Sequence, residues 1–258
     1  MDYEWPGLDP FRELRRGLPV VAAVLFVLAP AVPMWRISVE AVQYPTTELY
    51  LDLYAYPRID GTYVEMANLN KYVGFYYPDP VLIEPNYTPY PYAIDVPEWA
   101  LGPLAFVGVA LLSLFVALAP TAEKLKRGLT AQLDGTIAVF EIMLADIQYR
   151  LYQAGHHLDP DAPIMGVEGF TPPLWGTYEV ANITSHSRFG LGAYLSMLAI
   201  GLLAVAYRCR DTRTTVGDLP ELAAELPDRI RERRDRRGGA EATDPDRESP
   251  ATKASERR

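Results

Sequence analysis

The sequence predicts a membrane α-helical fold with four transmembrane helices and a small extracytoplasmic β-rich cap. Three runs without any charged residue lead to this prediction, at 17–34, 99–119 and 189–207. Each run is close to the length of about 20 residues that a helix needs to cross roughly 30 Å of hydrocarbon. Between the first two runs, residues 35–98 contain stretches in which apolar and polar residues alternate, as in strands with one buried face.

Basic residues flank the apolar runs in a consistent way. By the positive-inside rule they lie in the cytoplasm, which places 1–16, 120–128 and 208–258 inside and 35–98 outside. The clusters are Arg12, Arg15 and Arg16; Lys124, Lys126 and Arg127; and Arg208, Arg210 and Arg213.

The first run could also be a signal peptide, because arginines precede it. Acidic residues lie ahead of it as well, and no small-residue cleavage motif follows it, so the sequence favours an uncleaved anchor. Pro30 and Pro33 predict a kinked or frayed outer end for this helix.

A fourth span follows from parity. The runs 99–119 and 189–207 both have basic residues after them, so both run from outside to inside, and one helix must return between them. The expected span is 129–149, although Asp134, Glu141 and Asp146 interrupt it. This places 150–188 outside, both termini in the cytoplasm, and the protein in the cell membrane as a multi-pass protein.

The acidity of the chain falls in the segments expected outside. Residues 36–98 and 150–188 together contain 13 Asp and Glu against 5 Lys and Arg, a net charge of −8 out of −9 for the chain. Such a surface is typical of a salt-loving source and repels nucleic acid. The expected partners are therefore membrane lipid and an extracytoplasmic or membrane protein, and not nucleic acid.

The segment 35–98 predicts a small antiparallel sheet. Alternation predicts strands at 36–42 and 49–56, with turns at 44–47 and 58–61. Residues 65–77 are expected to begin as a helix and to end extended. The Pro- and Tyr-rich stretch that follows is expected to be irregular.

The second outer segment, 150–188, is expected to be a loop, because its glycines and prolines disfavour long regular elements. The cytoplasmic tail, 208–258, is charged and poor in aromatic residues, so it is expected to be mostly disordered.

Four blocks of the chain, at 34–45, 68–78, 152–164 and 170–177, resemble a known family. The family consists of multi-pass membrane proteins encoded in nitrous oxide reductase gene clusters, beside a copper chaperone. The resemblance implies accessory service to an extracytoplasmic copper enzyme: maturation, copper supply or electron delivery. The residues that match the family pattern are Trp35, Gln43, Tyr44, Pro45, Asn70, Tyr72, Gly74, Gly155, Asp159, Pro160, Pro172, Pro173 and Gly176.

Two positions depart from that family pattern. Lys71 stands where the family has a histidine, and His157 adds an imidazole after His156. The first departure removes one imidazole that could serve in the family's chemistry, and the second supplies another nearby.

The histidines and one methionine are candidate metal ligands, with copper as the candidate metal. Imidazole suits copper and zinc, and a thioether suits Cu(I). His156 is the first candidate, followed by His157, His186 and Met165. The alternative is a structural hydrogen-bonding role, since the spacing alone builds no metal site.

Asp134, Glu141 and Gln148 recur every seven residues and therefore share one face of the expected third span. Ionisable groups at such depth usually face a bundle interior or a water-filled path. One interpretation is a proton or ion route, and the other is a buried polar clasp.

The sequence contains no Gly-rich phosphate loop, nucleophile elbow, haem attachment motif or metalloprotease helix. A turnover enzyme is therefore not expected. Besides the accessory role, two alternatives remain: a proton- or ion-conducting transporter or channel subunit that uses the intramembrane acids, and a structural membrane anchor for a partner complex.

Overall fold

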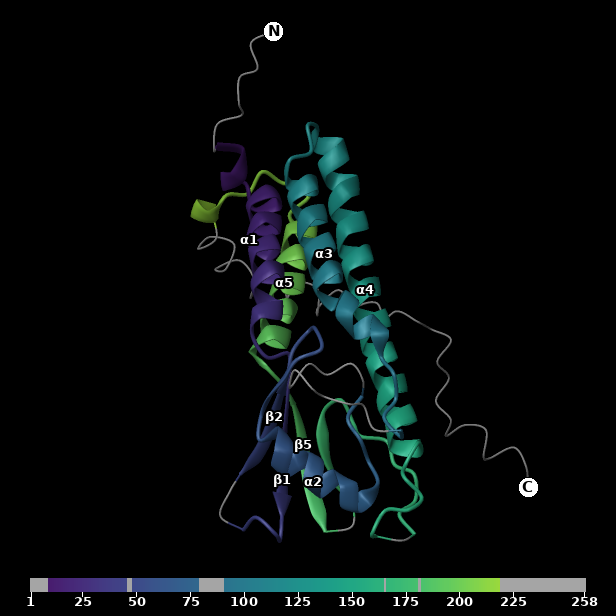
Figure 1. Ribbon diagram of the computed structural model, residues 1–258. Coiled ribbons are helices and arrows are strands. Elements are labelled where there is room, and N and C mark those ends of the chain that lie inside the picture. The colour runs from purple at the N-terminus through teal and green to yellow at the C-terminus, as the bar shows by residue number, and fades with distance from the viewer. Residues whose placement is uncertain (1–8, 46–47, 79–90, 165, 181, 219–258) are drawn as a thin grey trace, which may run out of the picture. The chain divides into compact units, whose positions relative to one another are not determined.

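The computed structural model describes residues 9–45, 48–78, 91–164, 166–180 and 182–218. The chain divides into two compact units, Met1–Arg213 and Thr214–Arg258. The described part of the first unit contains a helix bundle and an antiparallel sheet (Figure 1). In the second unit a short 3-10 helix, Val216–Asp218, is closed by the Asp218 carboxylate, which accepts from the Thr215 N–H. Most of the expected disordered tail, from 219 onward, lies outside the described residues.

Four helices in the described residues are long and apolar enough to cross a membrane. Their number equals that of the predicted spans. The helices are α1 at Leu14–Leu28, extended by a 3-10 turn at Ala29–Ala31; α3 at Gly102–Ala117, preceded by a 3-10 turn at Pro97–Leu101; α4 at Ala122–His156; and α5 at Leu191–Arg208.

Aromatic and small side chains fill the interior of the bundle. The Phe140 ring of α4 stacks on Phe26 of α1, with centroids 5.7 Å apart, and meets Phe106 of α3 edge-on at 5.2 Å. Such contacts suit a membrane interior, where close packing rather than the hydrophobic effect holds helices together.

One polar network also lies inside the bundle. The buried Gln132 amide of α4 donates to Ser113 Oγ on α3 at 2.8 Å and to Thr136 Oγ1 at 3.0 Å. It also approaches the Val109 carbonyl oxygen, at 3.3 Å. These contacts place Gln132 level with the middle of α3.

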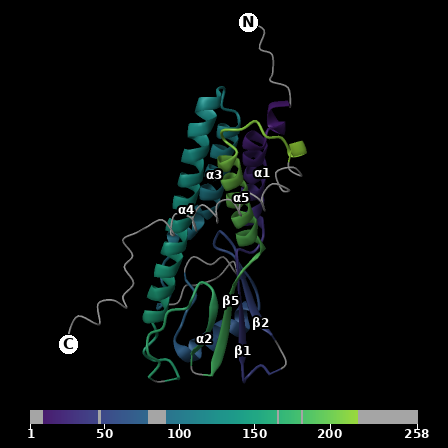
Figure 2. The same cartoon turned by 180° about the vertical axis from the view of Figure 1, so that it is seen from behind.

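The sheet lies at one end of the bundle (Figures 1 and 2), and contacts join the three basic clusters at the other end. Arg16 donates to the Ala117 carbonyl oxygen at 2.8 Å, Arg15 approaches that of Arg210 at 3.4 Å, and Lys126 pairs with Asp211. The arrangement agrees with the parity argument, because it puts all the flanking cations on the same side.

The sheet has the strand order β3-β2-β1-β5-β4, with every neighbouring pair antiparallel. The bounds are β1 Trp35–Ala41, β2 Leu49–Leu53, β3 Ile59–Gly61, β4 Gly176–Val180 and β5 Ile183–Phe189. Leu49 and Leu51 are fully buried and pack with Met66 and Leu69 of α2, which spans Tyr63–Val73.

On its other side the sheet presents polar groups. Arg36 of β1 makes a two-point ion pair with Asp52 of β2, with nitrogen–oxygen distances of 2.7 and 2.6 Å. Ser38 is two residues after Arg36 on β1 and pairs with His186 of β5, so both side chains lie on the same face of the sheet as Arg36. One face therefore packs inward and the other faces solvent, as the alternation predicts.

Three expectations about loops are wrong. The segment 150–188 is not a loop throughout, because it completes α4 and supplies β4 and β5. The predicted turn at 58–61 contains the short strand β3. The expected cytoplasmic loop 120–128 belongs mostly to α4, which Thr121 caps by accepting a hydrogen bond from the Lys124 N–H at 3.3 Å.

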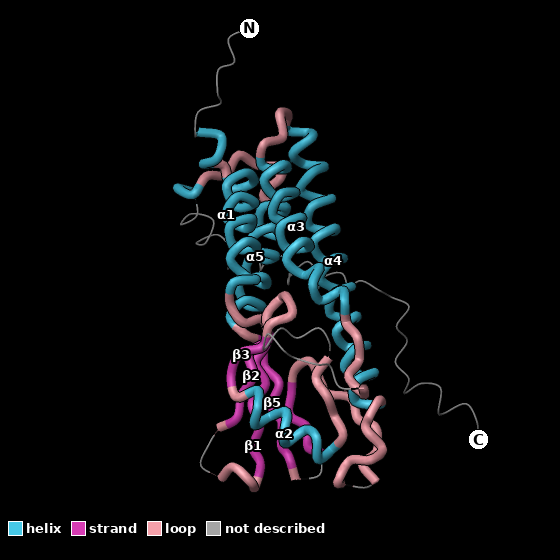
Figure 3. The backbone as a smooth tube through the Cα atoms, in the orientation of Figure 1, coloured by secondary structure: helices cyan, strands magenta, loops and turns pink. Residues whose placement is uncertain are grey.

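Helix α4 is much longer than the predicted span 129–149. It has 35 residues and continues past the bundle to lie beside the sheet (Figure 3). The half of α4 nearer the sheet forms an ion pair with the turn before α3, in which Arg150 Nε donates to a Glu98 carboxylate oxygen at 2.5 Å. One continuous helix thus joins the bundle to the cap.

Candidate functional site

Helix α2 ends at Gly74, and the loop after α4 packs directly against this end. Gly74 has a φ of 81° and caps the helix, since its N–H donates to the carbonyl oxygens of Asn70 and Lys71. A Cβ atom here would lie 2.8 Å from the Asp159 carbonyl oxygen. Glycine is needed both for the backbone conformation and for this close approach.

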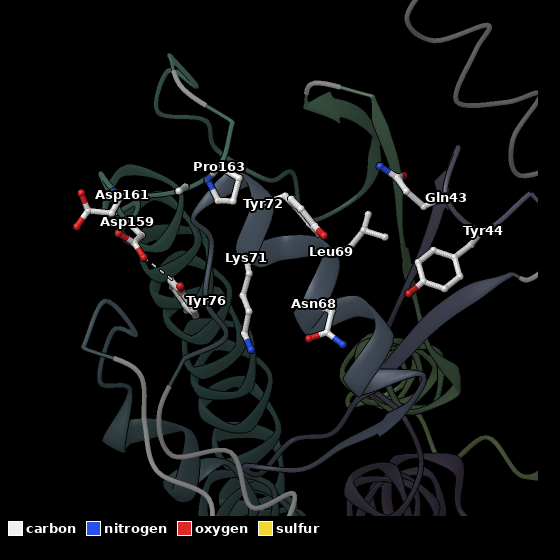
Figure 4. A pocket seen from close by; sticks show the side chains of 11 residues that line it. Gln43, Tyr44, Asn68, Leu69, Lys71, Tyr72, Tyr76, Asp159, Asp161 and Pro163 are labelled. Atoms are coloured by element: carbon white, nitrogen blue, oxygen red, sulfur yellow. Dashed lines mark hydrogen bonds between the residues drawn. The ribbon is translucent and has the colours of Figure 1, made fainter.

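Asp159 fixes the position of the loop. Its N–H donates to the Gly74 carbonyl oxygen at 2.9 Å, and its carboxylate accepts from the Asp161 N–H at 2.9 Å and from the Tyr76 hydroxyl at 3.0 Å (Figure 4). The contact to Asp161 is an Asx turn, which Pro160 suits because its φ is fixed. A sharply bent loop is therefore held against α2.

These contacts border an open cleft of about 650 Å³, which we term the motif cleft (Figure 4). Residues from three separate blocks of the sequence line it: the turn after β1, helix α2 with the segment just after it, and the loop after α4. The lining residues are Gln43, Tyr44, Asn68, Leu69, Lys71, Tyr72, Tyr76, Asp159, Asp161, Ala162 and Pro163.

The motif cleft offers a mixture of groups that suits recognition of another protein surface. Lys71 supplies a cation and Asp161 an exposed carboxylate, while Gln43 and Asn68 carry amides that both donate and accept hydrogen bonds. Tyr72, 53% exposed, adds an aromatic ring with a polar tip, the kind of side chain enriched at interfaces.

Sequence reasoning missed part of this site. Asn68, Tyr76 and Asp161 lie inside the blocks that resemble the family, but they were not singled out as candidates. Their position between the matched residues was the available signal. The blocks 34–45, 68–78 and 152–164 meet in one cleft because of the sheet and the turn after α4.

The remaining residues that match the family pattern lie at positions that shape the backbone. Gly155 packs against the backbone of Phe170, where a Cβ would lie 1.9 Å from the carbonyl oxygen, and its own carbonyl accepts from the Phe170 N–H. The Pro172 carbonyl oxygen accepts from Gln148 at 3.4 Å. Trp35 and Gly176 begin β1 and β4, Pro173 lies just before Gly176, and Pro45 follows the cleft residue Tyr44.

The three histidines occupy different places. His156 ends α4, stacks on the Tyr152 ring at 4.1 Å, and has Nδ1 2.8 Å from the Tyr152 carbonyl oxygen. His157 contacts the ring of Tyr92. His186 lies on β5, where its Nδ1 is 2.8 Å from Thr177 Oγ1.

The candidate metal set is therefore not assembled in the described part of the chain. No group of three or more His, Cys, Asp and Glu side chains there is placed to hold a metal ion. Met165 lies outside the described residues. The His156 and His186 contacts match the structural hydrogen-bonding alternative.

Position 71, where the resemblance implies a histidine, lies in the motif cleft. Lys71 shares it with Asp159 and Asp161. The departure from the family pattern therefore changes the charge of this cleft directly. Lys71 thus contributes a cation to a lining that also holds acidic and aromatic groups.

A second cavity, of about 640 Å³, lies between the sheet and α4 and is mainly apolar. Trp35, Ile37 and Val39 of β1 line it from the sheet side. Tyr77 also lines it, and burial raises the pKa of its hydroxyl well above the ordinary value, so this group stays neutral. The cavity is a continuation of the core under the sheet.

The polar residues of the third span lie in unexpected positions. Asp134 and Glu141 are exposed on the side of α4 that faces away from the bundle, and Gln148 is half-buried beside Pro172. Neither acid therefore lines the interior of this chain's own bundle. The interior is instead lined by Gln132 and its partners.

Neither a protein family, nor a curated protein, nor a solved structure matches this chain in comparisons with known proteins.

Proposed function

We propose that this chain is an integral membrane accessory protein that serves an extracytoplasmic copper enzyme of nitrous oxide reduction. Its role is to dock that enzyme, or a maturation factor of it, in the motif cleft. The transmembrane helices keep the cleft close to the membrane, where the partner is assembled or receives copper or electrons.

The observation that supports this proposal is the convergence of three of the four blocks that carry the resemblance. Residues 43–44, 68–76 and 159–163 are far apart in the chain, yet they line one cleft. A partner that recognises the cleft would require side chains from all three blocks together.

The proposal assigns recognition, rather than metal storage, to this site. In the described residues the histidines are spread over α4, the residue after it and β5. The cleft itself offers Lys71, two carboxylates and two amides, which are suited to hydrogen bonds and ion pairs across an interface.

Deletion and complementation in the native host test the proposal. Cells without the gene should reduce nitrous oxide poorly and should contain an external reductase with a low copper content. The wild-type gene should restore both quantities. Lys71→Glu should fail to restore them, because it reverses the charge in the cleft. The matched control is Lys124→Glu at the opposite end of the bundle, which should restore both.

Two results would overturn this proposal. One is a copper-replete, fully active reductase in the deletion strain. The other is full restoration of nitrous oxide reduction and of copper content by Lys71→Glu, because the charge of the cleft would then not matter. The amount of each variant in the membrane, measured by immunoblotting, separates loss of docking from loss of the protein.

A further inference from the structure

Helix α4 is the least covered of the four candidate spans. In the most apolar stretch of α4, 17% of the residues are buried, whereas the corresponding share is 28% for α5 and 39% for α1 and for α3. It packs against α3 and α5 and turns its remaining surface away from the bundle. That surface includes Ala131, Ala138 and Ala145, all exposed.

Two carboxylates lie on this outward surface at the depth of the apolar spans. Asp134 is two residues from Gln132, which contacts the middle of α3. Glu141 follows Phe140, whose ring meets Phe106 in the second turn of α3. Both acids are therefore level with α3 and not with the extramembrane cap.

Neither carboxylate has a hydrogen-bond or ion-pair partner among the described residues. Exposure of either group to lipid would be costly, since intramembrane acids almost always pair or face water. Asp and Glu are also too short to reach the membrane surface from this depth, as long Lys and Arg side chains do. The face is thus incomplete in the isolated chain.

Charge decides what can complete this surface. A second copy cannot supply a cation, because its segments 17–34, 99–119 and 189–207 contain no charged residue. Pairing of two α4 faces would bring carboxylates against carboxylates, which repel. A suitable occupant carries hydrogen-bond donors with positive charge, and the alanines allow a helix backbone to come close.

We propose that the outward face of α4, centred on Asp134, Ala138 and Glu141, docks a transmembrane helix of another protein that carries lysine or arginine side chains. The two acids are seven residues apart, so they are separated by about 10 Å along the helix. Two basic residues at the same spacing on the partner would meet both of them. This intramembrane surface is separate from the motif cleft.

A defined peptide tests the proposal. The full-length protein is labelled on a cysteine that replaces Thr212, in a Cys209→Ser background, and is reconstituted in phosphatidylcholine vesicles. The probe is a synthetic Leu/Ala transmembrane helix with two lysines seven residues apart, and the control peptide has leucine at both positions. Energy transfer between the two labels measures association.

The lysine helix should bind at least about tenfold more tightly than the leucine helix, a preference of the size that polar pairs give in membranes. The double variant Asp134→Leu/Glu141→Leu should lose this preference. Glu123→Leu, on the same helix but in its first turn, should keep it. Thermal melting shows that each variant remains folded, and replacement of intramembrane charge by leucine should not lower the melting temperature.

Equal binding of the two peptides would overturn the proposal. So would a disulfide-linked homodimer formed efficiently through Ala138→Cys in the Cys209→Ser background, because a second copy would then occupy the face. Peptide binding in vesicles is measured without any reductase, so the two proposals fail independently.

Discussion

At the residue scale, Gly74 decides whether the motif cleft can form. It combines a positive φ with a backbone approach to Asp159 that leaves no room for a side chain. Gly166 has a nearly equal φ of 78°, but a Cβ there would meet nothing within 4 Å. The two glycines thus separate the cost of backbone strain from the cost of a clash.

We expect Gly166→Ala to lower the free energy of unfolding by about 1 kcal/mol, because the new side chain causes backbone strain but no clash. Gly74→Ala should cost about 1–3 kcal/mol more, since the loop after α4 must also move away. Unfolding of the purified variants in detergent measures the difference. Equal losses for the two variants would show that the contact with Asp159 contributes little.

Single residues explain why only some of the residues at the cleft could be named from the sequence. The matched residues Tyr72, Gly74 and Asp159 could be named from the chain, because they belong to recognisable blocks. Their contacts could not, since the Tyr76–Asp159 hydrogen bond joins positions 83 residues apart. The separation of the histidines could not be predicted either, because His186 lies on β5, a strand that the sequence did not indicate.

At the element scale, the sequence signal was weakest in α4 and β5. Acids interrupt the middle of α4 and its ends are polar, so parity, and not an uncharged run, indicated a span at 129–149. In β5 the buried positions are Ile183, Ser185 and Ser187. Two serines on the inward face hide the alternation of apolar and polar residues that identifies a strand. By contrast, Leu49 and Leu51 made β2 easy to predict.

Packing and hydrogen bonding within the bundle can be compared on α4 itself. We expect Phe140→Ala to destabilise the protein by about 3 kcal/mol, because it opens a cavity between Phe26 and Phe106. Gln132→Leu should cost about 1 kcal/mol or less, since hydrogen bonds between membrane helices average roughly 0.6 kcal/mol. Unfolding in mixed detergent micelles with increasing dodecyl sulfate measures both changes.

The opposite order would contradict this expectation. It would mean that the polar network of Gln132, Ser113 and Thr136 fixes the position of α4 more firmly than the aromatic contacts do. Leu133→Ala, an apolar truncation on the same turn, is a control for general sensitivity of this helix.

At the scale of the whole molecule, the arrangement of charge could be predicted from the sequence. Parity required an odd number of spans between two helices of the same direction, and the four candidate spans agree with it. The contacts of Arg16 and Lys126 gather the basic clusters at one end. The position of the sheet strands after α4 could not be predicted, because β1 and β5 are about 150 residues apart and pair only in the fold.

The sidedness is tested with single cysteines in a Cys209→Ser background. Glu168→Cys, in the loop after α4, should react with an impermeant maleimide in intact cells. Thr212→Cys, beyond α5, should react only after the cells are permeabilised. Both positions are exposed in the structure, so differences in burial do not account for a difference in labelling. The reverse pattern would place the motif cleft in the cytoplasm.

The length of α4 has a mechanical consequence. A straight helix of 35 residues extends about 52 Å, of which a membrane span would take up roughly 30 Å. In the proposed membrane arrangement the remainder acts as a rigid strut that holds the cleft at a set height above the lipid. Removal of seven residues from the projecting half would shorten the strut by about 10 Å while keeping nearly the same helical phase. A membrane-bound partner built for the original reach would then no longer meet its surface.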